Sequence, residues 1–320
     1  MKVLVIQNRM GIGDMVIFLP FIEAISKKLN TQVSILVKEN SKAKEFLNET
    51  KSIKEIISLD RDNKKKGNHD GFLGTLKLIK EIKNHDFDKV FIFNSSLRFF
   101  LICKLANIKD VHQYPLFKKK NQHIIKAAQD FLNKKLNLNV ESKPEITLNE
   151  QKINDAKKKY NFSSSKTNIL LGIGGSGDTK RIPAETFIKF IDQCSNFKEC
   201  RFFLATGNNE QELIILNKIL ASANGKNCEK LNHLQISETL PIIKNCNISI
   251  CNDSSFSHLS AALNIPTIVL MADTPLLYGN YNPMMHPIMP DGENNVTHNT
   301  LGKDRINPDK IFKKFREIII

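Results

Sequence analysis

The sequence lacks the long apolar runs that a membrane-spanning helix requires. Its longest such run is Met15–Ile22, which has eight residues and is closed by Glu23, whereas a spanning helix needs roughly 20 residues. The first residues lack the pattern of a signal peptide, so we expect none. We therefore expect a cytoplasmic protein without a transmembrane segment, which a surface contact could still hold at a membrane.

Regular cysteine spacing is also missing. The chain has no C-x-x-C pair and no H-E-x-x-H motif, so it predicts neither a disulfide framework nor a zinc site. We interpret the six cysteines as reduced, mostly buried small side chains: Cys103, Cys194, Cys200, Cys228, Cys246 and Cys251.

Acidic residues are few relative to basic ones, which gives a net charge of +14. Composition alone favours a lysine-rich surface without a specific partner. The alternative is an anionic partner, such as nucleic acid, a phosphorylated lipid head group or a membrane surface. Two lysine runs, in RDNKKKGNHDG (61–71) and FKKKNQH (117–123), are either solvated loops or a basic docking face.

What the chain does have is an alternation of β-branched runs and amphipathic stretches, the pattern of parallel sheets covered by helices. A polar stretch, NLNVESKPEITLNEQ (137–151), separates two such series. We predict two Rossmann-like α/β domains, 1–160 and 161–305, and a C-terminal helix, 306–320, that packs back on the first domain. Two such domains would face each other across a cleft, with ligands at the carboxyl ends of the strands.

The expected strands are Lys2–Ile6, Val33–Val37, Ile56–Leu59, Lys89–Phe93, Ile169–Ile173, Arg201–Ala205, Ile248–Cys251 and Thr267–Met271. The expected helices are Asp14–Leu29, Ser41–Asn48, Phe72–Lys83, Leu97–Ala106, Gln122–Leu136, one ending near Tyr160, Ala184–Gln193, Glu210–Ala221, Ser237–Lys244, His258–Leu263 and Pro308–Ile319.

The first motif is GIGDMV, directly after the first strand. A dinucleotide fingerprint G-x-G-x-x-G that starts at Gly11 and Gly13 would need a third glycine where Val16 stands, so that interpretation is weak. The turn instead presents Asp14. This residue either caps the following helix, worth roughly 1 kcal/mol, or acts as a general base, although a helix N-terminus stabilises a carboxylate and weakens it as a base.

The second motif is ILLGIGGSGDTKRIPAETF (169–187), in which a hydrophobic strand runs into four of the chain's 14 glycines. Glycines let backbone N–H groups approach a phosphate, and Lys180 and Arg181 can neutralise its charge. The Walker A pattern is absent, because no glycine precedes Lys180. A phosphate site is favoured over a glycine-rich turn without a ligand.

The third motif is ISICNDSSFSHLSAALNIPTIVL (248–270). Asp253 ends a strand, two serines follow, and His258 starts a helix of small residues. These residues either cap that helix or hold a diphosphate and the hydroxyls of a sugar. A single histidine is more often structural, but proximity to Asp253 and a phosphate loop favours a ligand role for His258.

Taken together, GIGDMV, GGSGDTKRIPAETF and NDSSFSHLSAALNIPTIVLMADTP resemble, in order and spacing, glycosyltransferase family 9, the heptosyltransferases of the lipopolysaccharide inner core. The resemblance implies a GT-B fold and inverting transfer of a sugar, heptose from ADP-heptose, to a lipopolysaccharide core or related surface glycan. It implies no metal and no cofactor beyond the nucleotide-sugar donor.

The resemblance also assigns roles to residues. Asp14 matches the catalytic base, Lys180 the lysine that binds the donor diphosphate, and Asp253 the acid that contacts the donor sugar. The residues matched to the donor site are Gly174, Gly175, Ser176, Thr179, Lys180, Asp253, Ser254, Ser255 and His258. Those expected to bind an anionic glycolipid acceptor at the inner membrane surface are Gly13, Lys64, Lys65, Lys66, Lys118, Lys119 and Lys120.

The sequence departs from the family pattern at three places. Ser255 stands where the family usually has glycine, Ile182 where an aromatic commonly follows Lys-Arg, and MADTP has Asp273 and Thr274 in reversed order. These departures concern the donor more than the fold. The D-R-D at Asp60–Asp62 resembles a metal-binding D-x-D, but Arg61 and three lysines beside it favour chance.

Two alternatives remain open. Another two-domain nucleotide-sugar enzyme, such as an epimerase, would need no acceptor face. A non-catalytic nucleic-acid-binding protein would suit the positive charge, but the chain has no RNP or zinc-finger signature and no aromatics interleaved with its basic runs. We therefore expect no nucleic-acid partner.

Overall fold

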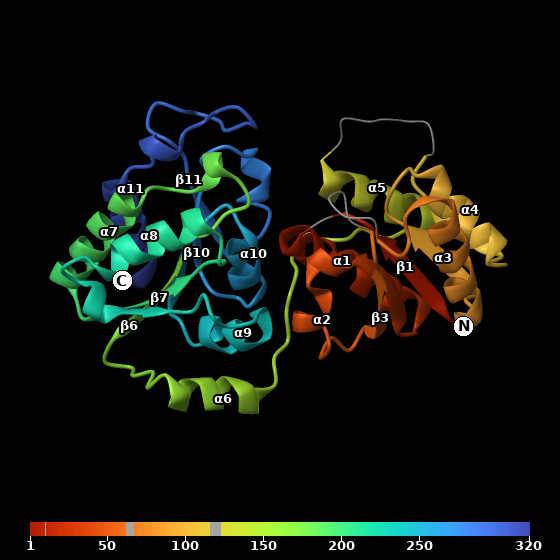
Figure 1. Ribbon diagram of the computed structural model, residues 1–320, viewed down its shortest axis with the longest axis horizontal. Helices are drawn as coiled ribbons and strands as arrows, with labels where there is room; N and C mark the ends of the chain where they lie inside the picture. The colour runs from red at the N-terminus through yellow and green to blue at the C-terminus, as the bar shows by residue number, and fades with distance from the viewer. Residues whose placement is uncertain (10, 62–66, 116–122) are drawn as a thin grey trace. The chain divides into compact units, whose positions relative to one another are not determined.

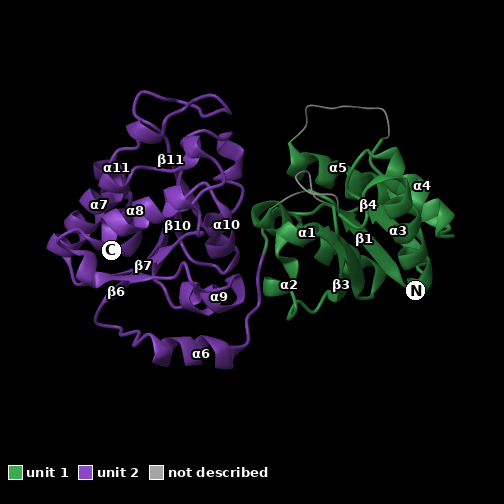
Figure 2. Cartoon of the chain, in the orientation of Figure 1, with its two compact units in different colours: residues 1–144 green, residues 145–320 purple. Residues whose placement is uncertain are grey.

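A computed structural model describes residues 1–9, 11–61, 67–115 and 123–320, which form two compact units, Met1–Pro144 and Glu145–Ile320 (Figures 1 and 2). The lysines expected to bind the acceptor, 64–66 and 118–120, lie outside the described residues, as does Asp62.

Unit 1 consists of five strands with helices between them. Its strands are β1 (Val3–Gln7), β2 (Val33–Lys38), β3 (Ile53–Leu59), β4 (Lys89–Ile92) and β5 (Asp110–Gln113). Its helices are α1 (Ile12–Leu29), α2 (Ala43–Phe46), α3 (Gly71–His85), α4 (Leu97–Leu105) and α5 (Ile124–Leu136).

The strands of unit 1 form one parallel sheet in the order β3-β2-β1-β4-β5, with Val3 of β1 opposite Val33 of β2. From β1, the chain adds β2 and β3 on one side of the sheet; it then adds β4 and β5 on the other side. Right-handed crossovers therefore place α3 and α4 on one face of the sheet and α1 on the opposite face. The point where the order reverses, between β1 and β4, is where open α/β sheets bind ligands.

Unit 2 repeats this plan with six strands. They are β6 (Thr167–Gly172), β7 (Cys200–Ala205), β8 (Cys228–Lys230), β9 (Ile248–Asn252), β10 (Thr267–Leu270) and β11 (Met285–Ile288). The helices are α6 (Glu150–Lys159), α7 (Ala184–Phe197), α8 (Glu210–Leu220), α9 (Ile236–Lys244), α10 (Ser255–Ala262) and α11 (Pro308–Ile319).

The second sheet is also parallel, in the order β11-β10-β9-β6-β7-β8, and its order reverses between β6 and β9. Its core is built from inward-facing strand residues and the apolar faces of α7, α8 and α11. All eight expected strands are present with shifted ends, so the predicted α/β class is confirmed.

Three short strands, β5, β8 and β11, escaped the sequence analysis. Each has only three or four residues, and β5 (DVHQ) and β8 (CEK) have polar sequences in which no residue is fully buried. Pairing along the edge of an existing sheet, rather than an apolar run of their own, therefore makes them strands.

The C-terminal helix, which we expected to pack on the first domain, belongs to unit 2 and packs on α7 there. Phe315 of α11 is fully buried and meets Phe190 of α7 edge-on, with ring centroids 5.7 Å apart. Lys189 of α7 pairs with Asp309 of α11 at 3.1 Å. The amphipathic pattern of this helix correctly predicted burial of one face, but it carries no information on which unit provides the partner.

The boundary between the units also differs from the one expected at residue 160. Unit 2 begins at Glu145, so α6 belongs to it. This helix packs on α9, and the side-chain amide of Asn245 donates to the carbonyl of Ile153 at 2.9 Å. None of the helices in the described part of the chain is both long and apolar enough to cross a bilayer.

Candidate active site

The glycine-rich loop of unit 2 leaves β6 at the point where the sheet order reverses. A Cβ on Gly172 would lie 2.6 Å from the Cys251 sulfur of β9, so only glycine lets these two strands end side by side. Asn252, fully buried at the end of β9, donates from its side-chain amide to the carbonyls of Ile173 at 2.8 Å and Gly174 at 3.2 Å. The loop is thereby fixed to the neighbouring strand.

A buried carboxylate supports the same loop from the other side. Glu212, in the first turn of α8, accepts a hydrogen bond from the backbone N–H of Gly175 at 2.8 Å. A Cβ on Gly174 would lie 2.8 Å from this carboxylate, and one on Gly207 would lie 2.5 Å from it. Both glycines therefore provide the space in which Glu212 sits.

Lys180 and Asp253 come from the two sides of the reversal point and meet there. The Lys180 ammonium lies 3.2 Å from Oδ2 of Asp253, which directly follows β9. The Asp253 side chain is 5% exposed and that of Lys180 is 23% exposed. The pair therefore presents its cation to solvent above a buried acid, which suits a site for a diphosphate.

The histidine expected at the start of a helix lies in the middle of α10. His258 is buried, its Nδ1 is 2.9 Å from the Tyr281 hydroxyl, and its Nε2 is 4.0 Å from Oδ1 of Asp253. Burial, and then the Asp253 charge, raise the pKa of Tyr281, which therefore stays protonated. The geometry links Tyr281, His258 and Asp253 into one polar row below Lys180.

The two cations of the T-K-R sequence point to different partners. Whereas Lys180 contacts Asp253, the Arg181 guanidinium donates to the carbonyl of Gly175 at 3.0 Å and also contacts Asp178 and Gln211. Arg181 is therefore a positioning residue that holds the glycine loop. We expected both cations to neutralise one phosphate, but the Arg181 guanidinium is held by Gly175, Asp178 and Gln211, and Lys180 pairs with Asp253.

The hydroxyl residues of the predicted donor site lie around this pair at different depths. Ser254 is the N-cap residue of α10, and its buried Oγ has no hydrogen-bond partner among the described residues. Ser176 is exposed, and Thr179 and Ser255 are half-buried. The N-terminus of α10 is a suitable place for an anion, because its N–H groups and dipole favour negative charge.

The M-A-D-T-P loop has a structural role at one of its two polar residues. Oδ1 of Asp273 accepts the backbone N–H groups of Asn299 at 3.0 Å and Leu301 at 2.9 Å, which fixes the 299–301 segment. Thr274 is buried, and its hydroxyl has no partner among the described residues. Of the pair, Thr274 is thus the residue with an unused polar atom.

In unit 1, Asp14 is not the helix cap that one interpretation of the sequence proposed. The cap residue of α1 is Gly11, whose φ of 102° favours glycine, and the Met15 N–H donates to the Gly11 carbonyl. Asp14 lies with Gly13 in the first turn, and its Oδ1 pairs with Arg9 Nε at 3.1 Å. The helix begins two residues earlier than predicted, so the carboxylate is available for a role other than capping.

Arg9 also lines a cavity of about 710 Å³ at the carboxyl edge of the unit 1 sheet. Three aromatic rings, Phe93, Tyr114 and Phe131, pack edge-on at centroid distances of 5.1 to 6.0 Å and form its apolar wall. Its other lining residues are Asn8, Phe18, Asn94, Ser95, Gln113, Pro115, Ile124, Ala127, Asp130, Lys134 and Lys135.

The sequence analysis missed this cavity and the support from Glu212. The cavity lining comes from the ends of β1, β4 and β5 and from α1 and α5, five segments that no motif connects. Glu212 lies 37 residues from its partner Gly175. Only the position of Asn209, an N-cap residue three places before Glu212, marks that helix start in the sequence.

Comparisons with known proteins agree with this architecture. The model of glycosyltransferase family 9 (heptosyltransferase) matches residues 75–300. Lipopolysaccharide heptosyltransferase 1 of Campylobacter coli is 26% identical over 168 residues, 50% of this chain and 49% of that protein. The chain therefore spans about half the length of this curated relative.

Two solved structures share the fold over almost their whole length. E. coli ADP-heptose LPS heptosyltransferase II has a TM-score of 0.74 and 17% identity, covering 99% of this chain and 98% of its own. E. coli heptosyltransferase WaaC with ADP has a TM-score of 0.73 and 15% identity, covering 99% of both chains. The predicted GT-B fold is thus confirmed, and because the family model matches most of its residues, the chain belongs to glycosyltransferase family 9, the heptosyltransferase family.

Proposed function

We propose that the protein transfers a heptose from ADP-heptose to a lipopolysaccharide core or a related surface glycan, with inversion at the anomeric carbon. The main support for donor binding is the Lys180–Asp253 pair, which lies beside the glycine loop where the strand order reverses between β6 and β9. The choice of an adenine nucleotide is supported by the related E. coli structure that holds ADP.

In the proposed reaction, Asp14 accepts the proton of the acceptor hydroxyl. The acceptor oxygen forms a bond to the anomeric carbon while the bond from that carbon to the diphosphate breaks. The leaving nucleoside diphosphate takes the electron pair, and the Lys180 ammonium stabilises its new charge. The proton ends on Asp14, so the step balances without a further reactant or a metal.

The geometry around Asp14 supports a role as base. Arg9 contacts only Oδ1, and Oδ2 has no hydrogen-bond partner among the described residues, which leaves one carboxylate oxygen for a hydroxyl. The Arg9 contact orients the carboxylate. A base of modest strength suffices when proton removal accompanies bond formation to an activated carbon.

The acceptor half of the proposal rests on the unit 1 cavity. Its aromatic wall suits the apolar face of a sugar ring, and Arg9, Lys134 and Lys135 supply positive charge at its lining for an anionic acceptor. These residues join Gly13 as acceptor candidates within the described part of the chain. The lysines at 64–66 and 118–120 stay a sequence prediction, as does peripheral attachment of a cytoplasmic protein to the inner membrane.

Calorimetric titration of the purified chain with ADP, ADP-heptose, UDP and GDP tests the donor. We expect ADP species to bind and the other nucleotides to bind at least about 10-fold more weakly, a difference of 1.4 kcal/mol. Preference for UDP would favour an epimerase-like enzyme or another donor sugar. Salt-dependent binding to random duplex DNA, with no response to any nucleotide, would contradict the proposal and favour a nucleic-acid-binding protein.

A further inference from the structure

Many of the large apolar side chains that the described chain exposes gather on two helices of unit 1. Phe72 and Leu73, in the first turn of α3, are 77% and 79% exposed. Along α4, exposed leucines recur at every fourth position and so form a stripe on one side of the helix. The apolar members of this surface, here called the α3–α4 face, are Phe72, Leu73, Leu76, Leu97, Leu101 and Leu105.

The two helices present one continuous surface because they lie side by side on the same face of the sheet (Figure 1). Leu78 and Ile82 of α3 share a buried cluster with Phe99 and Ile102 of α4. The sides opposite these buried residues face away from the sheet, and they carry the exposed leucines and Phe72.

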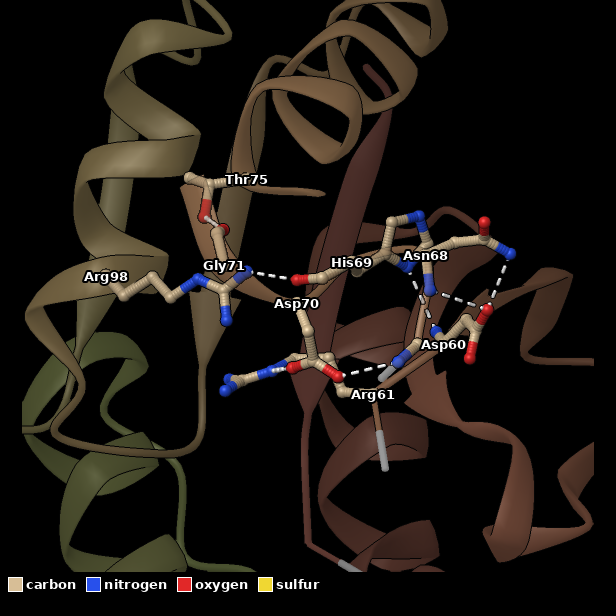
Figure 3. A network of polar contacts seen from close by, with 9 residues as sticks. Asp60, Arg61, Asn68, His69, Asp70, Gly71, Thr75 and Arg98 are labelled. Carbon is tan, nitrogen blue, oxygen red and sulfur yellow. Dashed lines mark hydrogen bonds and ion pairs between the residues drawn. The ribbon is translucent and has the colours of Figure 1, made fainter. Parts of the chain in front are cut away.

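A polar network fixes the start of α3 against α4 (Figure 3). The Arg98 guanidinium of α4 donates to the backbone carbonyl of His69, just before α3. His69 is 4% exposed, its Nδ1 accepts the Asp60 N–H at 3.0 Å, and its Nε2 lies 2.9 Å from the Glu81 carboxylate. These contacts fix the turn directly before Phe72 and Leu73, whose side chains are exposed.

The charges on this face have one sign. Lys77, Lys80 and Lys83 are exposed along α3 beyond its apolar first turns, and Lys104 is exposed on α4. Within Gly71–His85 and Leu97–Leu105, both fully described, the one carboxylate is Glu81, which contacts His69. The face thus combines protruding apolar side chains with uncompensated lysines.

We propose that the α3–α4 face docks on the surface of an anionic lipid bilayer. Apolar side chains inserted at the head-group level, with lysines beside them, give the two attractions that interfacial binding requires. A symmetric contact between two copies would oppose the same lysines to one another, because each copy presents the same patch. Charge complementarity therefore favours a lipid surface over a second copy of this chain.

This inference rests on the proposed function and deepens it, since it names the surface through which the protein would attach to the inner membrane. It also specifies an orientation. Helices α3 and α4 begin at the carboxyl edge of the unit 1 sheet, and the cavity lined by Arg9 and Ser95 lies at this same edge. Phe72, Leu73 and Leu97 lie at the starts of these helices, so docking through the α3–α4 face would bring that edge near the bilayer.

Co-sedimentation of the purified chain with vesicles tests the docking. The probes are vesicles of phosphatidylcholine alone and vesicles with about one-third phosphatidylglycerol, both free of glycolipid acceptor. We expect binding only to the anionic vesicles. Phe72→Ser with Leu73→Ser should lower the partition coefficient about 10-fold, and Lys77→Gln, Lys80→Gln and Lys83→Gln together about 100-fold.

The matched controls lie on unit 2. Ile214→Ser removes a half-exposed apolar side chain, and Lys226→Gln with Lys230→Gln removes two exposed lysines; all should bind like the wild type. Equal sedimentation of every variant, or no binding to anionic vesicles, overturns the proposal. So does a dimer in sedimentation equilibrium that the Phe72→Ser, Leu73→Ser variant converts to monomer, because a second copy would then cover the face.

Circular dichroism checks that each variant is folded. Since neither donor nor acceptor is present in the vesicle assay, a failure to bind leaves the transfer reaction untouched. A failure of sugar transfer in solution likewise leaves the docking result unchanged.

Discussion

Removing Lys180 and removing Asp253 should have unequal effects on stability, although the two residues form one ion pair. The Asp253 carboxylate is 5% exposed, whereas the Lys180 side chain is 23% exposed. Lys180→Ala leaves a buried carboxylate without its ammonium partner, and His258 Nε2 lies 4.0 Å from its Oδ1. Asp253→Asn instead leaves an ammonium group that water can reach.

The magnitudes follow from this difference. Breaking a fully buried pair by removing one partner costs about 3–5 kcal/mol, and partial solvent access at Lys180 lowers that value. We expect Lys180→Ala to reduce the free energy of unfolding of unit 2 by about 2 kcal/mol and Asp253→Asn by about 1 kcal/mol or less. The double variant should lose less than the sum of the two, because no charge is left unpaired.

Urea unfolding of the wild type, both single variants and the double variant measures these differences. Calorimetry with ADP separates binding from stability: Lys180→Ala should weaken ADP binding about 10- to 100-fold, the worth of a charge-assisted contact. Equal stability of the two single variants, with additive losses in the double variant, would refute the argument from burial. An unchanged ADP dissociation constant in a folded Lys180→Ala variant would refute the diphosphate role.

Three further predictions follow from other positions. Asp14→Asn should keep ADP binding and the unfolding midpoint but lose transfer by at least about 100-fold; retained turnover would contradict its role as base. Gly11→Ala should destabilise unit 1 by about 1–2 kcal/mol because of the φ of 102°, with Gly177→Ala as the unstrained control in thermal melts. Burial lowers the pKa of His112 and His286 from about 6.5, so the unfolded state binds more protons than the folded state near that pH. The free energy of unfolding should therefore be highest above pH 7 and fall as the pH drops below about 6.5. His112→Gln should flatten this pH dependence, measured as urea unfolding midpoints.

The strands and helices of the two sheets could be predicted because buried parallel strands require apolar runs, as in VLVIQ of β1 and NILLG of β6. The strands that escaped prediction lie where that requirement is weak. All four residues of β5 are half-buried, so its sequence carries no hydrophobic signal. The sequence also could not assign α11 to a unit, because a helix shows the chemistry of its apolar face but not the identity of the opposite surface.

The candidate site also has a part that local sequence predicts and a part that it does not. The positions of Asp14, Lys180 and Asp253 could be predicted because each follows a recognisable strand, where side chains reach the carboxyl edge of a sheet. The cavity in unit 1 was not, since Phe93, Tyr114 and Phe131 have no common motif and meet only when the sheet is assembled. Chain topology, and not local pattern, creates that part of the site.

In each unit, an oppositely charged side chain lies beside the residue proposed to take part in transfer. Asp14 has Arg9 at 3.1 Å, and Lys180 has Asp253 at 3.2 Å, with both partners of each pair in the same unit. Neither charge therefore needs the other unit to be stable in the folded chain. Replacing Arg9 should change the orientation of the Asp14 carboxylate without affecting nucleotide binding. ADP titration therefore tests unit 2 alone. Acceptor-dependent turnover at saturating donor tests what unit 1 contributes.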